Sequence, residues 1–286
     1  MSKFQVKEKR INPDTLLFSA RPKVGKTTKL TELKNNLIIN LEKNGSDFIR
    51  LIDNIDCSDI LNATPTDIKE VLLDDVTTKI LDLGDITSPS DRIKALTRIL
   101  NALIALGKPY DYVSIDTITQ ADLDSEWAGT ELYMDKLQGK THNRLNTPGL
   151  PSTQWKRLTH GENGYESVIE TLGQNGYRWS RTIMVDLLNL SRQVSKKCTI
   201  YVAHIKDKQL SKGDKGEVYV KDIALTGAVV DIYSRNVAAV ASVWRDEDKL
   251  MISFKGNEDK TGGNRGLVGD YEGDFQWEKI FIEPKK

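Results

Sequence analysis

One stretch decides the fold of this chain: Ala20-Arg21-Pro22-Lys23-Val24-Gly25-Lys26-Thr27-Thr28. It follows the pattern small-x-x-x-x-Gly-Lys-Thr, with Ala20 at the position where a glycine usually stands. The backbone N–H groups of such a loop, opening onto the N-terminus of a helix, surround the phosphates of a nucleotide. Gly25 lets the backbone come close, Lys26 reaches the β- and γ-phosphates, and the Thr27 hydroxyl is a ligand for Mg²⁺.

The residues on either side of this stretch supply the structural context that a phosphate loop requires. The apolar run Thr15–Ser19 precedes it and predicts a buried strand. A helical pattern follows from Lys26 to Lys34, with Leu30 and Leu33 at helical spacing. Strand, loop and helix therefore occur in the order that nucleotide binding needs, and a lysine-rich surface turn is the alternative interpretation.

Composition bounds the classes of protein to which the chain can belong. Its 286 residues suit a single α/β domain, here taken as 1–286, with an N-terminal extension over 1–14. Lys plus Arg and Asp plus Glu both number 41, so a globally basic nucleic-acid-binding surface is excluded and only local patches remain. Cys57 and Cys198 form no disulfide or metal-binding pattern, which favours a reducing cytoplasm. We expect no signal peptide and no membrane span.

Strand-like runs alternate with helical patterns along the chain. This alternation predicts an α/β fold with a mostly parallel central sheet flanked by helices. The clearest helix is Ile93–Leu106, which Gly107 and Pro109 end. The expected strands are 15–19, 37–41, 112–115, 199–203, 237–243 and 250–254.

One long segment interrupts the alternation. Residues 125–181 are rich in Gly, Pro, Asn and Thr, and predict an inserted, lid-like segment with short helices after the strand that ends at Asp116. A helix over 182–194 then returns the chain to the sheet. A further segment, 206–222, carries several glycines and charges and predicts a mobile loop.

Three polar residues end predicted strands and are candidates for chemistry. Asp116 ends an apolar strand, as a Walker B carboxylate that holds Mg²⁺ does, and we count it as the end of the third strand, next to the phosphate loop. Glu42 ends the second strand, where it can polarise an attacking water or be a solvated strand-end residue. His204 ends the fourth strand, where it can sense the γ-phosphate or be an ordinary structural residue with no role in the chemistry.

This layout resembles the RecA-like ATPases, and among them the compact phage nucleotide-binding proteins of the single-strand annealing and recombination type. The resemblance implies ATP and Mg²⁺ as ligands, Glu42 as general base, and assembly into a homo-oligomeric ring or filament. RecA-like relatives also carry a Lys-x-Arg pair that reaches the neighbouring subunit. Here Lys255 fits the first position, Asn257 stands at the second, and Lys260 or Arg265 could supply the missing charge.

RecA-like proteins hold single-stranded DNA on loops that follow the sheet strands, so two regions are candidate DNA contacts. One is the segment 206–222, whose positive surplus is small, and a solvated hairpin is the alternative there. The other places cations beside aromatic residues within the predicted insertion, as single-strand binders do, although such aromatics also form local cores. The candidate residues are Lys206, Lys208, Lys212, Lys215, Trp155, Lys156, Arg157, Arg178, Trp179 and Arg181.

Three functions are compatible with these residues. A DNA-stimulated ATPase in phage-type recombination or replication uses every feature. A P-loop small-molecule kinase would use the arginines of the insertion but gains little from Glu42 or His204. A non-catalytic nucleotide-binding assembly module needs only the loop. ATP is favoured over GTP because His204-Ile205-Lys206-Asp207 lacks the base-reading Asn/Thr-Lys-x-Asp pattern of guanine-specific folds.

Overall fold

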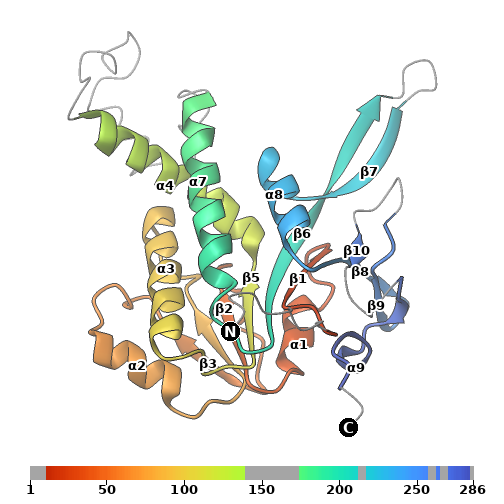
Figure 1. Cartoon of the computed structure of the whole chain (residues 1–286), viewed down its shortest axis with the longest axis horizontal. Helices are drawn as coiled ribbons and strands as arrows, with labels where there is room; N and C mark the ends of the chain where they lie inside the picture. Colours follow the sequence, from red (N-terminus) through yellow and green to blue (C-terminus); the bar gives the residue numbers. More distant parts are fainter. Residues whose placement is uncertain (1–10, 139–173, 212–216, 257–261, 265–269, 284–286) are drawn as a thin grey trace, which may run out of the picture.

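The computed structural model describes residues 11–138, 174–211, 217–256, 262–264 and 270–283. Its strands are β1 Thr15–Ala20, β2 Asn36–Asn40, β3 Asp53–Asp56, β4 Lys79–Asp82, β5 Tyr112–Asp116, β6 Cys198–Ser211, β7 Glu217–Ile223, β8 Ala239–Asp246, β9 Lys249–Ser253, β10 Gly263–Asn264 and β11 Glu272–Asp274. The main sheet has the order β11-β9-β8-β1-β6-β5-β2-β4-β3 (Figure 1). Neighbours from β8 to β3 are parallel, and β9 and β11 extend that edge antiparallel.

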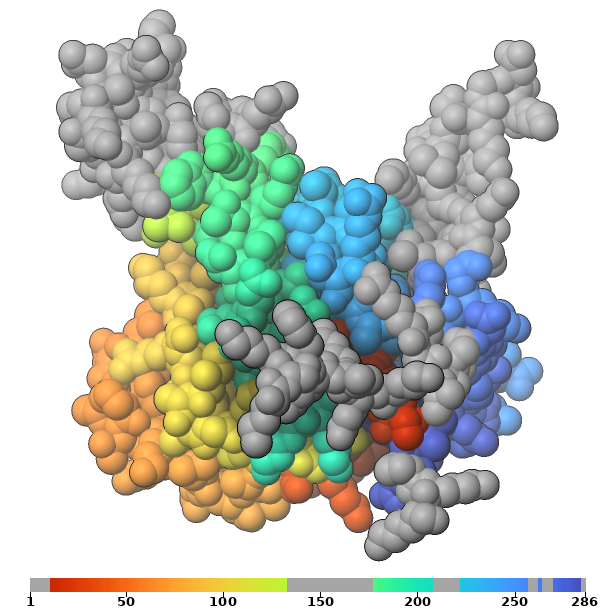
Figure 2. All heavy atoms as spheres, viewed as in Figure 1, coloured from red at the N-terminus to blue at the C-terminus, as the bar shows by residue number. Residues whose placement is uncertain are grey.

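Helices cover both faces of this sheet. They are α1 Lys26–Thr31, α2 Pro65–Leu73, α3 Pro89–Ala105, α4 Ile118–Gln138, α7 Gln174–Ser191, α8 Ala228–Asn236 and α9 Trp277–Ile280. Because side chains alternate along a strand, Leu17 packs with α3, α4 and α7, whereas Leu16 and Phe18 pack with α1 and α9. Figure 2 shows α3, α7 and α8 side by side on the surface of one face. The predicted α/β architecture, a mostly parallel sheet between helical layers, is confirmed.

Local signals explain where the clearest helix begins and ends. The Ser88 hydroxyl accepts a hydrogen bond from the Asp91 N–H and caps α3, and Pro89 occupies its first turn. Gly107, with φ of 75°, follows its end. The helix predicted over 93–106 is thus confirmed and begins one turn earlier, at Pro89.

The predicted bounds of the insertion need correction. Residues 125–138 continue α4 and residues 174–181 belong to α7, so the helix predicted over 182–194 is instead Gln174–Ser191. The two helices touch through small residues: the hydroxyls of Ser125 and Ser180 are 2.7 Å apart, and a Cβ on Gly129 would lie 2.6 Å from the Ser180 nitrogen. This close packing needs the small residues whose composition resembles a loop. Residues 139–173 lie outside the part that the structure describes.

Two further expectations differ from the fold. The prediction that one strand separates the phosphate loop from the Asp116 strand is wrong, because β2, β3 and β4 all lie between them in the chain. The segment 206–222 is largely an antiparallel hairpin of β6 and β7, paired from Ile205–Ile223 to Ser211–Glu217. Charged residues in β3 and β6 conceal the strand pattern. Within the described residues, no helix has the length and apolar character needed to cross a bilayer.

Candidate active site

The phosphate loop connects the end of β1 to the first turn of α1. Gly25 adopts φ of 102°, a left-handed conformation that favours glycine, and directly precedes α1. The Lys29 N–H donates to the Gly25 carbonyl over 3.0 Å and starts the helical ladder. Ala20 is fully buried as the last residue of β1, paired with His204 of β6. A methyl group is therefore accommodated there because the residue is still in the strand rather than in the turn.

Thr27 and Asp116 provide two oxygen atoms at the N-terminus of α1. The Thr27 hydroxyl donates to Asp116 Oδ2 over 2.5 Å, and Asp116 is only 4% exposed. Burial raises the pKa of Asp116, against the opposing effects of the Thr27 hydrogen bond and the nearby Lys26. A hydroxyl and a carboxylate are hard oxygen ligands of the kind that Mg²⁺ prefers, so this pair fits the predicted metal. In the described ranges, no group of three or more His, Cys, Asp or Glu residues is arranged to hold a metal ion.

Glu42, His204 and Lys26 form a connected group beside this pair. His204 Nε2 lies 2.5 Å from Glu42 Oε1, and Lys26 Nζ lies 3.2 Å from His204 Nδ1. Lys26 also donates to the carbonyl oxygen of Arg21 over 3.3 Å. The structure thus brings the loop lysine, the end of β2 and the β6 strand to one point, as their positions in the sequence predict.

The pKa values of both Glu42 and Lys26 are lowered, which favours the charged form of Glu42 and disfavours the charged form of Lys26. Burial acts to raise the pKa of Glu42, but hydrogen bonds from His204 and Thr117 and the charge of Lys26 outweigh it, so the pKa lies below its usual range. Burial lowers the pKa of Lys26, while the charges of Asp116 and Glu42 oppose that effect. At neutral pH, Glu42 is therefore a carboxylate able to accept a proton.

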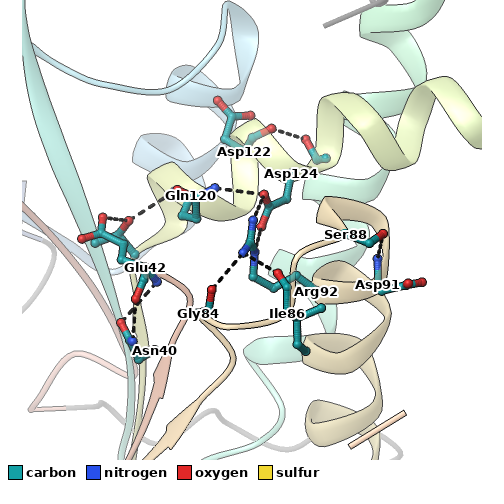
Figure 3. Close-up of polar contacts among 12 residues, drawn as sticks. Asn40, Glu42, Gly84, Ile86, Ser88, Asp91, Arg92, Gln120, Asp122 and Asp124 are labelled. Carbon is teal, nitrogen blue, oxygen red and sulfur yellow. Dashed lines mark hydrogen bonds and ion pairs between the residues drawn. The ribbon is translucent and has the colours of Figure 1, made fainter. Parts of the chain in front are cut away.

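A second group of residues, which the sequence does not reveal, holds Glu42 from the α4 side (Figure 3). The Thr117 hydroxyl donates to Glu42 Oε1 over 2.8 Å and accepts from the Gln120 N–H over 3.2 Å. The Gln120 side chain in turn donates to Asp124 Oδ1 over 2.9 Å. Arg92 of α3 binds Asp124 through two hydrogen bonds, of 2.6 and 2.8 Å, in a pair that is almost fully buried.

The backbone behind Glu42 is fixed as well. Asn40 donates to the Glu42 carbonyl over 2.8 Å and to Asp82 Oδ1 over 3.0 Å (Figure 3). A Cβ on Gly84 would lie 2.5 Å from the same Glu42 carbonyl, so only glycine fits there. Arg92 donates to the carbonyls of Gly84 and Ile86 over 3.4 and 2.8 Å. Polar residues at the paired strand ends Asn40 and Asp82 are the one sequence signal for this support.

The order of the strands explains how these groups meet. β6 lies between β1 and β5, so His204 stands between the phosphate loop and Asp116. The prediction that the Asp116 strand directly neighbours the loop strand is therefore wrong by one position. Asp116 still reaches Thr27, at the start of α1, through the 2.5 Å hydrogen bond between their side chains.

The other predicted site residues are not part of this group. Lys206 is exposed and donates to the Leu225 carbonyl over 2.8 Å; Arg178 and Arg181 are exposed on α7, and Trp179 is half-buried there. Lys208 belongs to β6, and Lys255 is exposed after β9. Trp155, Lys156, Arg157, Lys212, Lys215, Lys260 and Arg265 lie outside the described residues.

No protein-family model and no curated protein matches the chain. Among solved structures, a prototypical ATPase from the type III secretion system of pathogenic bacteria is similar at 11% identity and a TM-score of 0.38, covering 82% of this chain and 53% of that one. The assembled secretion ATPase EscN of enteropathogenic E. coli, in complex with its stalk EscO, gives 11% and 0.39, covering 82% and 42%. The RadB recombinase gives 8% and 0.36, covering 94% and 90%. The chain thus spans about half the length of the secretion ATPases. Sequence identities and TM-scores this low are not evidence of a shared function.

Proposed function

We propose that this chain is a Mg²⁺-dependent ATPase of the RecA-like type that acts on single-stranded DNA. One observation supports the ATPase most strongly: Lys26, Thr27, Asp116, Glu42 and His204 meet at the carboxyl ends of neighbouring parallel strands. Ligands of open α/β sheets bind at that edge. When bound, Mg²⁺ supplies positive charge that offsets the charge developing on the phosphate oxygens.

The residues have separate tasks in this reaction. Glu42, which its lowered pKa keeps ionised at neutral pH, orients the attacking water and is placed to accept its proton. Lys26 exchanges its contacts with the Arg21 carbonyl and the His204 ring for the terminal phosphates. His204 then loses a partner on Nδ1 while keeping its place at the base of the β6–β7 hairpin. Nucleotide occupancy is thereby coupled to the hairpin.

The proposed DNA contact rests on the position and composition of that hairpin. Figure 1 shows it extending away from the sheet, on the same side as the far ends of α4 and α7. Its register sets Lys206 opposite Asp222 and Asp207 opposite Lys221, and the Asp207 carboxylate lies 3.7 Å from Arg21 of the phosphate loop. The remaining candidates are Lys208 at the hairpin and the exposed Arg178 and Arg181 of α7. A single strand in phage-type recombination or replication is the partner that we propose for them.

The proposal includes a homo-oligomer, in which Lys255 or its neighbours reach the nucleotide of an adjacent subunit. It also includes a reducing cytoplasmic setting, for which the free, buried Cys57 and Cys198 are the support. Light scattering with and without Mg·ATP measures the assembly directly. A monomer under both conditions would contradict this part of the proposal.

The decisive experiment measures ATP hydrolysis with and without single-stranded DNA. Lys26→Ala serves as the blank, because it removes the phosphate-binding cation. Stimulation by DNA that disappears in Lys26→Ala is the expected result. Lys26-dependent turnover that is unaffected by DNA would contradict the proposed DNA partner but leave the proposed ATPase activity standing. No turnover under either condition would contradict both and favour an assembly module.

A further inference from the structure

Arg245 of β8 is a charged residue beside the phosphate loop that the site described so far does not use. β8 runs parallel to β1, paired from Leu16–Ala239 to Ser19–Ser242. Ala241 and Val243 pack in the same cluster as Leu30 of α1. Arg245 continues this face two residues further on, since side chains alternate along a strand. It therefore extends past the packed part of the sheet, level with the loop.

The contacts of Arg245 place its guanidinium directly on the loop. Nη2 donates to the Val24 carbonyl over 3.2 Å, and Nη1 donates to the Asp248 carbonyl over 3.3 Å. A Cβ built on Gly25 would lie 3.4 Å from Nη2. The guanidinium is thus in van der Waals range of the residue whose backbone must approach the phosphates.

The charge of Arg245 has no acidic partner within the described parts of the chain. Three acidic residues follow it, Asp246, Glu247 and Asp248, yet the contact to Asp248 is with its carbonyl oxygen, and no described carboxylate forms an ion pair with Arg245. The residue is exposed. Two neutral carbonyls use only part of a guanidinium's five donors, which leaves charge and donors available for an anion.

The orientation of a bound nucleotide follows from the two sides of β1. Asp116, Glu42 and His204 lie on the side of β6, β5 and β2, so the terminal phosphate must face that side. The rest of the nucleotide then extends toward the other side, where β8 lies. We propose that Arg245 binds the α-phosphate and ribose portion of a nucleoside di- or triphosphate within its own subunit. This inference rests on the proposed nucleotide binding.

Binding of ADP with Mg²⁺ to the purified full chain tests this role. Titration calorimetry compares the natural chain with Arg245→Ala, Arg245→Gln and Lys26→Ala. Arg245→Gln retains an amide donor for the Val24 carbonyl but removes the charge. Asp248→Ala is the matched control, because it keeps the carbonyl that Arg245 uses. We expect both Arg245 variants to bind ADP at least about tenfold more weakly, through loss of a charge-assisted contact, with Asp248→Ala unchanged.

The outcomes separate the two proposals. If the natural chain binds ADP and Arg245→Gln binds as well as it does, Arg245 only supports the loop and the inference is overturned, while the proposed nucleotide binding stands. The same holds if Arg245→Ala binds ADP normally. If the natural chain binds neither ADP nor ATP, the proposed function itself is contradicted and the inference fails with it.

Discussion

The two sides of the phosphate loop differ in how their charged groups are held. On the side of β6, β5 and β2, charged groups are bonded to other side chains: Asp116 to Thr27, Glu42 to His204, and Arg92 to Asp124. On the β8 side, Arg245 is exposed and bonded to backbone carbonyls. Hydrolysis requires a base within hydrogen-bond reach of its water, whereas holding a phosphate tolerates a longer, more mobile cation. Substitutions on the side of β6, β5 and β2 should therefore reduce turnover or stability more than substitutions on the β8 side do.

The largest effect on stability is expected from Asp124→Ala. This change leaves the Arg92 charge buried without its partner, which costs about 3–5 kcal/mol of the free energy of unfolding. Lys94→Ala, in an exposed ion pair with Asp91 on the same helix, is the control and should cost roughly 0–1 kcal/mol. Urea denaturation measures both. Equal losses would show that the buried pair has no special role.

The next largest effect is expected from Asp116→Asn, which should lower the rate of ATP turnover rather than the stability of the fold. The amide keeps the shape of the side chain but weakens the metal site, so kcat should fall roughly 10²–10³-fold. Phosphate release measured over a range of Mg²⁺ concentrations is the assay. The control is Asp111→Asn, which lies five positions before Asp116, just ahead of β5, and is paired with Lys197. Turnover close to that of the natural chain would remove Asp116 from the metal site.

Asp122 gives a prediction about pH. Burial raises its pKa from 3.8 to about 6, against the opposing hydrogen bonds from Thr226, so the folded state binds the proton more tightly than the unfolded state does. This carboxyl therefore adds stability at low pH, which is lost as the pH rises from about 4 to 6, at most about 3 kcal/mol. Asp122→Asn should flatten this part of the stability profile and be more stable at pH 7. A profile unchanged in shape would contradict the shift.

Thr117→Val tests the hydrogen bonds that position Glu42. The hydroxyl joins Glu42 to the Gln120 N–H, and losing both bonds should lower kcat about tenfold without changing ADP affinity. The control is Thr97→Val on α3, whose hydroxyl bonds only within its own helix. Equal kcat in the two variants would make Thr117 a structural residue only.

Local patterns predict one part of the site and miss the other. The loop, Asp116 and Glu42 are foreseeable because each is a motif position or stands at or just after the end of an apolar strand. The prediction that His204 ends its strand is wrong, because β6 continues past it to Ser211 and pairs there with β7. The pairing of Arg92 with Asp124 depends on how α3 packs on α4. Arg245 and Val24 are separated by 221 positions, and no spacing signals their contact. The α4–α7 contact is obscured because Ser125, Gly129 and Ser180 resemble loop composition, although close helix packing requires them.

The central claim is that Glu42 is the base of an ATPase, and Glu42→Gln tests it most directly. Phosphate release and Mg·ATP affinity are measured on the same preparation. The amide cannot accept the proton of the water, so kcat should fall about 10²–10⁴-fold while the affinity for ATP stays within about threefold. A variant that hydrolyses ATP as fast as the natural chain would contradict the account.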